Sequence, residues 1–484
     1  MHNWEPVIGL EIHAQLNTRS KLFSPAPNRF GDEPNTNISA VCTGQPGALP
    51  LLNREAVKKA IQFGLAIHGK ISLASSFSRK SYFYPDTPRN FQITQYEDPI
   101  VRSGSVTLDI EGNTRSFPIK EVHLEDDAGM LKHFTHFAGV DYNRAGAPLI
   151  EIVTEPCFRN SKEAAAFAME VRSILLYLDA CDGNMEEGSL RFDANVSVRR
   201  VGETVLRPRA EIKNLNSFSF LEMALAGEIE RQIALYTKEP NRPWLELIPP
   251  GTYRWDSSLQ KTILMRAKES ADDYRYFPEP DLPPIFLSVE MIDRLRDELP
   301  ELPRERFRRY ISDFSLSEHS AFVLTREKKL ADYFEAANRI CQSPKNLCNW
   351  MIVEFSGRLK ESGKSLVETA ISPEQMASLV RMIDSGKLTG PMAKQVADKM
   401  VLSPGKSPEE IVQGNPDFQP LDNAQEIEAL IDRVMQANPQ SVLDFQAGKE
   451  RAFGFLVGQV MKLSQGKASP SLVNDLLRQK LSSK

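Results

Sequence analysis

The stretch VIGLEIHAQL, from Val7 to Leu16, alternates between apolar and polar side chains. Its even-numbered residues are all apolar, whereas Glu11, His13 and Gln15 lie on the opposite side of an extended chain. A period of two is typical of a β-strand that rests one face on a core. We therefore predict a strand that presents a carboxylate, an imidazole and an amide in one row.

The same alternation recurs in four later segments, and each gathers its charged residues on one face. The segments are EVHLEDDAG (121–129), PLIEIVTEP (148–156), SLRFDANVSVRR (189–200) and RAEIKNLNS (209–217). Their polar faces hold Glu121, His123 and Glu125, then Glu151 and Glu155, then Arg191, Asp193, Asn195, Ser197 and Arg199, then Glu211 and Lys213. An antiparallel sheet with one solvated face explains any single strand of this kind. Repeated Glu, Asp, His, Asn and Arg instead of Thr, Lys, Ser and Gln favours a functional face.

The composition of these faces indicates that they bind a metal ion and phosphate groups. Carboxylates side by side repel one another unless cations neutralise them. Oxygen ligands suit Mg²⁺ or Mn²⁺, and interspersed Arg191, Arg199 and Lys213 suit phosphate oxygens. Carboxylates for a metal and cations for phosphate together indicate phosphoryl transfer from a nucleotide as one interpretation. A metal-dependent hydrolase shares most of these features and stays open at this point.

A second group of residues lies between Ser78 and Tyr96, in SRKSYFYPDTPRNFQITQY. Basic and aromatic residues alternate here, which suits stacking on a base or ribose together with phosphate contact. They are Arg79, Lys80 and Arg89 among Tyr82, Phe83, Tyr84, Phe91 and Tyr96. Rings that anchor a loop to the core explain each aromatic equally well. The two stretches nearest to a P-loop, Gly64–Ile71 and Gly357–Ser365, have the wrong final residue and the wrong spacing, so ATP would be bound without a Walker motif.

The order of elements predicts an α+β protein with three domains. Helices are expected at 54–68, 162–178 and 220–236, between strands at 7–16, 105–109, 120–126, 149–154, 190–199 and 210–214. Prolines between Pro278 and Pro303 indicate a boundary near residue 290. From Glu305 to Val401 the pattern is helical, and Leu402–Pro420 reads as a linker before short helices. We expect domains at 1–292, 293–405 and 406–484, the first built on an antiparallel sheet and the other two all-α.

The bulk composition is that of a globular protein, with 41% hydrophobic and 25% charged residues in a chain of 484. No run of about 18 apolar residues exists to span a membrane, and the N-terminus lacks a signal-peptide pattern. We therefore expect a cytoplasmic protein. The five cysteines are scattered and predict neither disulfides nor zinc. A net charge of −5 argues against wholesale coating of nucleic acid but leaves room for a local basic patch.

Seven ordered motifs resemble one protein family over nearly the whole chain. They are VIGLEIHAQLNTRSKLFSP, RKSYFYPD, HLEDDAG, VDYNRAGAPLIEIVTEP, MEEGSLRFDANVSVR, EIKNLNSF and DYRYFPEPDLPP. The family is GatB, the B subunit of the GatCAB aspartyl/glutamyl-tRNA amidotransferases. The tail FGFLVGQVMKLSQGKASPSLVNDLL resembles the C-terminal domain of that family.

The resemblance implies a fold, an activity and partners. The catalytic domain is expected to be cradle-shaped, with a helical domain and a tail domain that hold tRNA. A tRNA misacylated with glutamate or aspartate is phosphorylated on its side-chain carboxylate with ATP and Mg²⁺. Ammonia from the amidase, the A subunit, then gives Gln-tRNA(Gln) or Asn-tRNA(Asn), and the small C subunit completes a heterotrimer. Phosphorylation supplies a leaving group that a free carboxylate lacks.

The resemblance also implies roles for the residues of the polar faces. Glu11, His13, Glu125 and Glu151 are expected to coordinate the metal, with His13 neutral. Arg79, Lys80, Arg191, Asp193 and Lys213 are expected at the nucleotide, where Arg79, Lys80 and Arg191 are assigned by their charge more than by the resemblance. Glu11, Glu125, Arg191 and Glu211 are expected in catalysis. Two positions depart from the family: Asp126 replaces a glutamate, and Met130 replaces a lysine, so that no phosphate role extends to Met130.

The tail carries a charge of its own, and two rival functions stay open. Residues 441–484 hold seven Lys/Arg against three Asp/Glu, a local charge of +4 that fits contact with tRNA phosphates as well as an ordinary solvated helix face. A self-contained Mg²⁺-dependent ligase or hydrolase of a small carboxylate is the first rival function. A non-catalytic tRNA-binding protein is the second.

Overall fold

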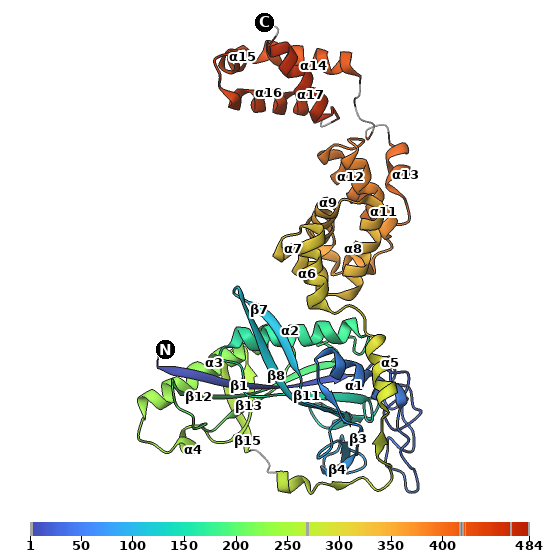
Figure 1. Ribbon diagram of the computed structural model, residues 1–484, viewed down its shortest axis with the longest axis vertical. Helices are drawn as coiled ribbons and strands as arrows, with labels where there is room; N and C mark the ends of the chain where they lie inside the picture. Colours follow the sequence, from blue (N-terminus) through green and yellow to red (C-terminus); the bar gives the residue numbers. More distant parts are fainter. Residues whose placement is uncertain are drawn as a thin grey trace. The chain divides into compact units, whose positions relative to one another are not determined.

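Two units make up the chain, Met1–Pro303 and Arg304–Lys484. The computed structural model describes residues 3–267, 271–415, 418, 421, 423–464 and 467–482. Sheet and helices alternate in the first unit, whereas every described element of the second unit is a helix (Figure 1). The predicted α+β class is confirmed.

A large sheet forms the centre of the first unit. Its strands pair in the order β15-β14-β13-β12-β1-β11-β8-β5-β4-β16, and β2, β6 and β7 join it beside β8. Their bounds are β1 (Trp4–Gln15), β2 (Lys70–Ile71), β4 (Ser78–Ser81), β5 (Phe91–Thr94), β6 (Val101–Arg102), β7 (Ser105–Ile110), β8 (Asn113–Asp126), β11 (Pro148–Thr154), β12 (Leu190–Arg200), β13 (Ala210–Leu215), β14 (Gly251–Asp256), β15 (Lys261–Ala267) and β16 (Phe277–Pro278). Two small ribbons pair separately, β9 (Met130–His133) with β10 (Ala138–Asp141) and β3 (Ala74–Ser75) with β17 (Ile285–Phe286).

The sheet is antiparallel with one exception. β13 and β14 run parallel, because the chain between them crosses over through α3 (Phe218–Lys238) and α4 (Trp244–Leu247). Parallel neighbours need a crossover of this length, whereas antiparallel neighbours can be joined by a turn. The predicted antiparallel sheet is therefore correct for the strands that surround β1.

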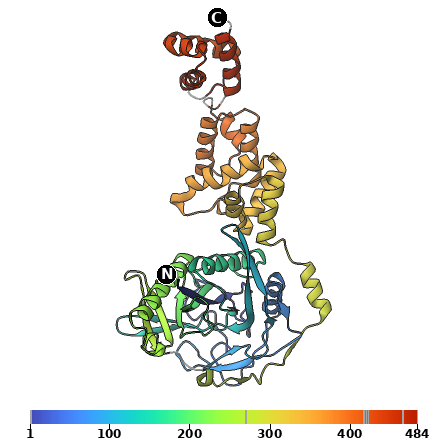
Figure 2. The ribbon, with the colours of Figure 1, turned by 60° about the vertical axis from the view of Figure 1, so that its left-hand side comes forward.

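The alternation of the first strand sets the two faces of the sheet. Ile8, Leu10, Ile12 and Ala14 are each at most 1% exposed and belong to one continuous core. Helices α1 (Arg54–Ala66), α2 (Ser161–Tyr177) and α3 cover this face (Figures 1 and 2). Glu11, His13 and Gln15 consequently lie on the other face of the sheet.

Capping residues fix where the covering helices begin. The side chains of Asn53, Asn160 and Ser217 accept hydrogen bonds from backbone N–H groups in the first turns of α1, α2 and α3. Each cap satisfies N–H groups that have no partner within the helix. The predicted helices agree with α1, α2 and α3 to within two residues at each end.

The first core extends further along the chain than the predicted boundary at residue 292. Helix α5 (Val289–Asp297) buries Ile292 and Leu295 in this core, and the boundary would cut through it. A proline-rich segment can still pack against a sheet when the residues between the prolines are apolar. A short 3₁₀ turn, η1 (Ala271–Tyr274), lies on the way to this helix.

The second unit contains two separate apolar cores. Its first core is formed by α6 (Pro303–Phe314), α7 (Glu318–Thr325), α8 (Lys328–Cys341), α9 (Pro344–Asn349), the π-helix η2 (Trp350–Phe355), α10 (Ser356–Leu359), η3 (Lys360–Ser362), η4 (Leu366–Glu368), α11 (Pro373–Asp384), α12 (Gly390–Leu402) and α13 (Pro408–Gln413). Its second core is formed by α14 (Ala424–Ala437), α15 (Pro439–Gln446), α16 (Glu450–Leu463) and α17 (Pro470–Ser482).

Within the predicted linker 402–420, the described residues 402–415 and 418 include a helix and buried side chains, whereas 416, 417, 419 and 420 lie outside the described residues. Helix α13 begins at Pro408 behind a capping box formed by Ser407 and Glu410. Its Ile411 is buried in the first helical core, as is Phe418 further on. Proline is well tolerated in a first helical turn, so the S-P-E-E sequence starts a helix where composition alone indicated a loop.

No helix in the described part of the chain combines the length and the apolar character that a membrane span requires. All five cysteines carry free thiols, three of them buried. Cys42 accepts or donates hydrogen bonds with the hydroxyls of Ser24 and Ser39, at 3.2 and 3.3 Å.

Candidate active site

Five neighbouring strands bring the predicted polar faces together. His13 on β1 lies opposite Glu151 on β11 and opposite Arg191 on β12. In the next row Glu11 lies opposite Asp193. Directly opposite side chains on one sheet face have Cβ atoms about 5 Å apart. The register therefore turns residues far apart in sequence into one polar surface.

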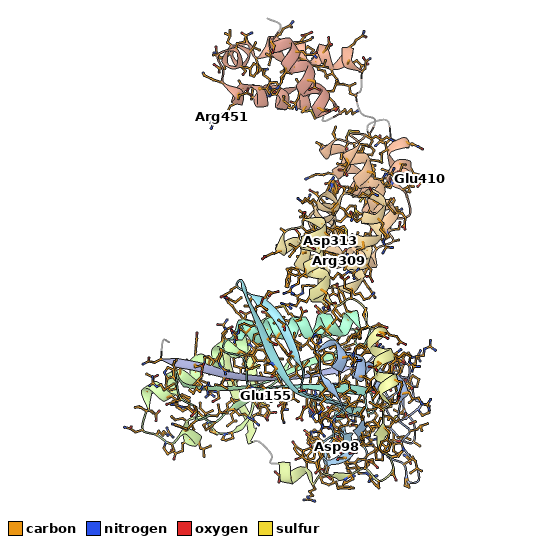
Figure 3. All side chains as sticks on the ribbon, viewed as in Figure 1. Asp98, Glu155, Arg309, Asp313, Glu410 and Arg451 are labelled. Atoms are coloured by element: carbon orange, nitrogen blue, oxygen red, sulfur yellow. The ribbon has the colours of Figure 1, made fainter. Side chains whose placement is uncertain are left out.

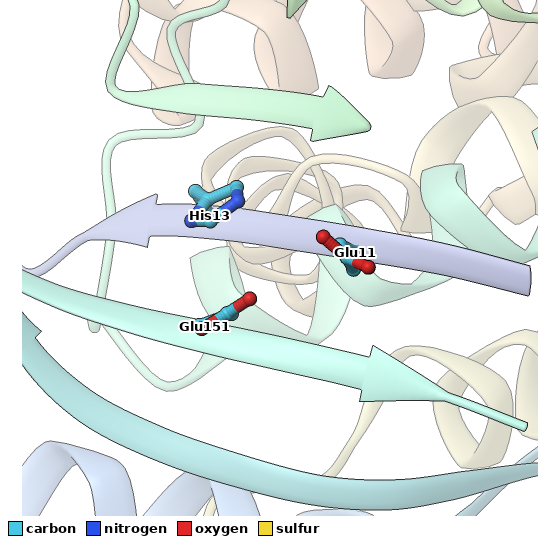
Figure 4. A group of neighbouring side chains, drawn as sticks. All are labelled: Glu11, His13 and Glu151. Carbon is cyan, nitrogen blue, oxygen red and sulfur yellow. The ribbon is translucent and has the colours of Figure 1, made fainter. Parts of the chain in front are cut away.

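Two groups of side chains on this surface have the spacing of metal ligands. Glu11, His13 and Glu151 each offer a donor atom within 4.8 Å of the others (Figure 4). Glu11, Asp193 and Glu211 form a second such group, so Glu11 belongs to both. Carboxylate oxygens with one imidazole suit a hard divalent cation such as Mg²⁺ or Mn²⁺. The donor set fits the metal that was predicted from the sequence.

Glu125, the fourth predicted ligand, reaches the first group through His13. Its Oε1 lies 3.6 Å from His13 Nδ1, and Asp193 Oδ2 lies 3.9 Å from His13 Nε2. Thr94 Oγ1 donates a hydrogen bond of 3.1 Å to Glu125 Oε2. His13 therefore stands between carboxylates of β8 and β12.

The carboxylates of this cluster outnumber the cations beside them. Burial and the charge of Glu125 raise the pKa of Glu151. Burial opposes a positive charge on His13, but the hydrogen bond with Glu125 and the charges of the surrounding carboxylates raise the pKa of the imidazole to about 9. These carboxylates thus favour the charged form of the imidazole in the protein alone. The neutral ring expected from the sequence is the form that can bind a metal, and it remains a prediction for the metal-bound site.

A second set of side chains is held together by ion pairs. Lys213 Nζ lies 3.0 Å from Asp193 Oδ2 and 2.9 Å from Glu211 Oε1. Glu11 Oε1 accepts a hydrogen bond of 2.9 Å from Asn195 Nδ2. The charges of both carboxylates raise the pKa of Lys213 against the effect of burial. Lys213 is therefore held as a cation at the border between the two groups.

Arg191 occupies the opposite border of the cluster. Its Nη2 donates a hydrogen bond of 3.0 Å to Asp127 Oδ2, which also accepts from Gln15 Nε2 at 3.1 Å. Arg144 Nε lies 3.5 Å from the same oxygen. The carboxylate of Asp127 thus orients two arginines at once.

A cavity of about 270 Å³ opens beside these side chains. His13, Glu125, Asp193, Arg191 and Lys213 line it, together with Lys80. Three further carboxylates do not line the cavity but lie next to residues that do. They are Glu11, Glu151 and Glu211. Burial opposes the charge of Lys80, but Tyr276, Glu125 and Glu151 raise the pKa of its amine. Acidic side chains and cations therefore line the cavity together.

Arg79 is the predicted site residue that the structure places elsewhere. Its guanidinium donates two hydrogen bonds to the buried carboxylate of Glu279, at 2.7 and 2.9 Å, and one to Asp281 at 3.0 Å. It is not among the described residues that line the cavity. These ion pairs connect β4 to the segment after β16. Because the guanidinium of Arg79 is already paired there, we leave this residue out of the site.

Several lining residues were not predicted as site residues from the sequence. Asp127 follows the last residue of β8, so alternation no longer tells which way it points. Asp126 accepts a 2.9 Å hydrogen bond from the backbone N–H of Ile93 and pairs with Arg89, so the departure from the family at this position still carries an ion pair. The only sequence signal for this pair was the charge of Arg89 among aromatic residues.

Comparisons with known proteins show which family the chain resembles. A family model described as the GatB/GatE catalytic domain matches residues 6–293, and one described as the GatB domain matches residues 332–481. The chain is 60% identical over 479 residues to a protein of Protochlamydia amoebophila, covering 99% of this chain and 97% of that one. It is 54% identical to a protein of Chlamydia pneumoniae, with coverage of 98% and 97%, and to one of Chlamydia abortus, with coverage of 99% for both. All three relatives are named as the B subunit of an aspartyl/glutamyl-tRNA(Asn/Gln) amidotransferase.

Proposed function

The chain belongs to the B-subunit family of the aspartyl/glutamyl-tRNA amidotransferases, and on this premise we propose that it activates the side-chain carboxylate of a misacylated tRNA for amidation. Its substrates are Glu-tRNA(Gln), Asp-tRNA(Asn) or both, and its products are Gln-tRNA(Gln) and Asn-tRNA(Asn). ATP supplies the phosphoryl group, and ammonia from an amidase partner supplies the nitrogen.

The observation that carries the proposal is the meeting of Glu11, His13 and Glu151 beside a cavity that is also lined by Lys80 and Arg191. Clustered carboxylates with too few cations are unfavourable unless a positively charged ligand binds there. The cations that also line the cavity, Lys80 and Arg191, suit phosphate oxygens, which need positive charge where water is excluded. A site for both a divalent cation and phosphate is the common requirement of phosphoryl transfer.

The chemistry proceeds in two displacements. An oxygen of the substrate carboxylate attacks the γ-phosphorus of ATP, the bond to the bridging oxygen breaks, and ADP leaves. Ammonia then attacks the acyl carbon, inorganic phosphate leaves with the transferred oxygen, and the nitrogen loses a proton to give the amide. A carboxylate without this activation would have to expel an oxide ion.

Residues of the cluster divide the work. Glu11, His13, Glu125 and Glu151 would hold Mg²⁺, which offsets the negative charge of the phosphates when bound. Lys80 and Arg191 bind phosphate oxygens and orient them. Glu211 and Asp193 hold Lys213 in place through the ion pairs described above. The carboxylates and amines of this chain thus bring two negatively charged substrates together.

The other parts of the chain would serve the RNA and the partner proteins. We propose that the first unit, residues 1–303, catalyses the reaction, and that the two helical cores of residues 304–484 bind the tRNA. The local charge of +4 over residues 441–484 supports contact with phosphates. The partners are the amidase, or A subunit, and the small C subunit of a heterotrimer. Because aminoacylated tRNA is its substrate, we propose that the protein works in the cytoplasm.

The test is amidation of Glu-tRNA(Gln) and Asp-tRNA(Asn) by the complex assembled with its partner proteins, with ammonium chloride as nitrogen source and labelled ATP. We expect ADP, phosphate and amidated tRNA in equal amounts, with strict dependence on Mg²⁺. Turnover of free glutamate without tRNA would favour the small-molecule ligase. Binding of tRNA without ATP turnover would favour a non-catalytic tRNA-binding protein.

A matched pair of variants connects this activity to the cluster. Glu11→Gln removes one shared carboxylate, whereas Glu155→Gln changes an exposed carboxylate just beyond the end of β11 (Figure 3). Only the first is expected to abolish amidation. Equal activity of both variants would contradict the assignment of the site.

A further inference from the structure

A second concavity of about 620 Å³ adjoins the catalytic cavity, and we call it the aromatic groove. Tyr82 and Tyr84 line it from the segment after β4, Phe220 from the first turn of α3, and Trp255 from β14. The groove thus lies where three elements distant in sequence meet, and aromatic rings form much of its wall.

The rings of the groove face solvent to an unusual degree. Tyr84 is 47% exposed and Phe220 37% exposed, and Met265 on the edge strand β15 also lines the groove at 59%. The rings of Tyr82 and Tyr84 are 5.8 Å apart and tilted by 32°. Large apolar side chains gathered on an open surface mark a binding site more often than a structural need. Open aromatic rings are the platforms on which nucleic-acid bases stack.

The polar residues of the groove suit a nucleotide. Lys213 and Arg254 both line it, and the Arg254 guanidinium is half exposed while it pairs with Asp256 at 3.4 Å. The first turn of α3 also borders the groove, with Ser217 as its cap. Cations beside aromatic rings can contact the phosphate of a nucleotide whose base is stacked on those rings.

Two residues belong to both the groove and the catalytic cavity, namely Tyr82 and Lys213. The groove and the cavity are therefore neighbours, and a ligand that occupies both would pass Tyr82 and Lys213. The acceptor end of a charged tRNA has this form, because its last nucleoside carries the amino acid. Resting on the function proposed above, we propose that the aromatic groove binds the 3′-terminal nucleoside of the misacylated tRNA by base stacking.

The exposure of the groove favours an RNA end over the adenine of ATP. Sites for free small molecules bury most of the ligand, about 70–90% of its surface. The groove is rimmed by exposed side chains, which leave room for the preceding nucleotides of a single strand to continue outward. The base of ATP in this groove is therefore the rival outcome of the test.

The test uses the full assembled complex and tRNA that carries 2-aminopurine at its 3′-terminal position. Stacking on the groove quenches this fluorescent base, and Phe220→Ala or Tyr84→Ala relieves the quenching. With charged tRNA, both variants raise KM for the tRNA about tenfold and leave KM for ATP unchanged, whereas Phe220→Tyr retains wild-type values. The control is Phe83→Ala, which removes a neighbouring ring that is 68% exposed and is not among the residues lining the groove.

Each other outcome overturns the assignment. A rise in KM for ATP with unchanged quenching and unchanged KM for tRNA assigns the groove to the adenine of ATP. Wild-type behaviour of both alanine variants in all three measurements assigns it to neither substrate. Failure of the proposed function gives a different result, because the wild type would then amidate no tRNA while the quenching measurement still reports on the groove.

Discussion

Two carboxylates, Glu151 on the sheet of the first unit and Glu335 in the helices of the second unit, are held in opposite ways. Glu335 on α8 accepts hydrogen bonds from Arg306, Arg309 and Tyr310, at 2.8, 2.6 and 3.0 Å (Arg309 is labelled in Figure 3). Burial would raise the pKa of Glu335, but the two arginines lower it. For Glu151 on the sheet, burial and a neighbouring carboxylate raise the pKa.

The difference separates a structural carboxylate from a functional one. A half-buried charge that is fully hydrogen-bonded stabilises the fold in which it lies. Carboxylates that repel one another destabilise the fold unless a ligand neutralises them, and such groups concentrate at functional sites. The residue type is the same in both regions. The number of cations within reach distinguishes them.

The largest effect is expected from Glu11→Gln, which should reduce amidation by more than about 100-fold. The folded protein should lose no stability, because the change removes a charge from a repelling cluster. Rates of amidated tRNA formation and thermal unfolding midpoints measure the two quantities. A variant that is inactive because it unfolds earlier would erase the distinction between the two regions.

The converse substitution is Glu335→Gln. It should lower the free energy of unfolding of the helical unit by about 2 kcal/mol, since three donors lose a charged acceptor. At temperatures where the variant is folded, ATP-dependent activation should remain as in the wild type. Denaturant unfolding, together with turnover at low temperature, checks both expectations. A loss of activity without a loss of stability would instead assign a catalytic role to the hydrogen bonds that Glu335 accepts.

Divalent cations should stabilise one region and not the other. Mn²⁺ at ten times its Kd is expected to add about 1.4 kcal/mol to the wild type by mass action. Glu11→Gln should abolish this gain, and Glu335→Gln should keep it in full. Thermal shift with and without chelator measures the effect. An equal gain in all three proteins would mean that the cation binds outside the cluster.

The smallest effect concerns acid pH. Because the pKa of Glu335 is lowered in the fold, its stabilising contribution is fully present above the unfolded value of about 4.3. The contribution is lost as the pH falls through the lower, folded value. Wild type and Glu335→Gln should therefore converge in stability below pH 4, as followed by denaturant unfolding at each pH. A constant difference down to pH 2 would contradict the lowered pKa.

Periodicity in the sequence was sufficient to predict the strands that carry the site and the helices that cover the sheet. Glu11 and His13 on one strand and Glu151 on another were each predicted on the polar side of their own strand, because alternation fixes the side on which a residue lies. Which strands are neighbours, and hence which residues meet, depends on pairing that no local pattern reveals. The family resemblance, not the spacing, grouped these residues with Glu125.

Sequence reasoning missed or misplaced the features that depend on residues elsewhere in the chain or on local capping. Asp127 lies just past β8, where alternation ends, and its role depends on Arg191 and Gln15 from other strands. Arg79 was assigned by its charge alone, and nothing local in the sequence shows that Glu279, two hundred residues later, binds it. The helix at Pro408 was overlooked because proline and glycine were counted as breakers without regard to the capping box before them.

The most direct test of the account follows one oxygen atom. Glu-tRNA(Gln) is prepared with ¹⁸O at both oxygens of the side-chain carboxylate of its glutamate and amidated by the complex with ATP and ammonium chloride. Phosphorylation of the carboxylate predicts one ¹⁸O in each molecule of inorganic phosphate released, and no release from Glu11→Gln. Phosphate free of ¹⁸O, formed together with amidated tRNA, would contradict it.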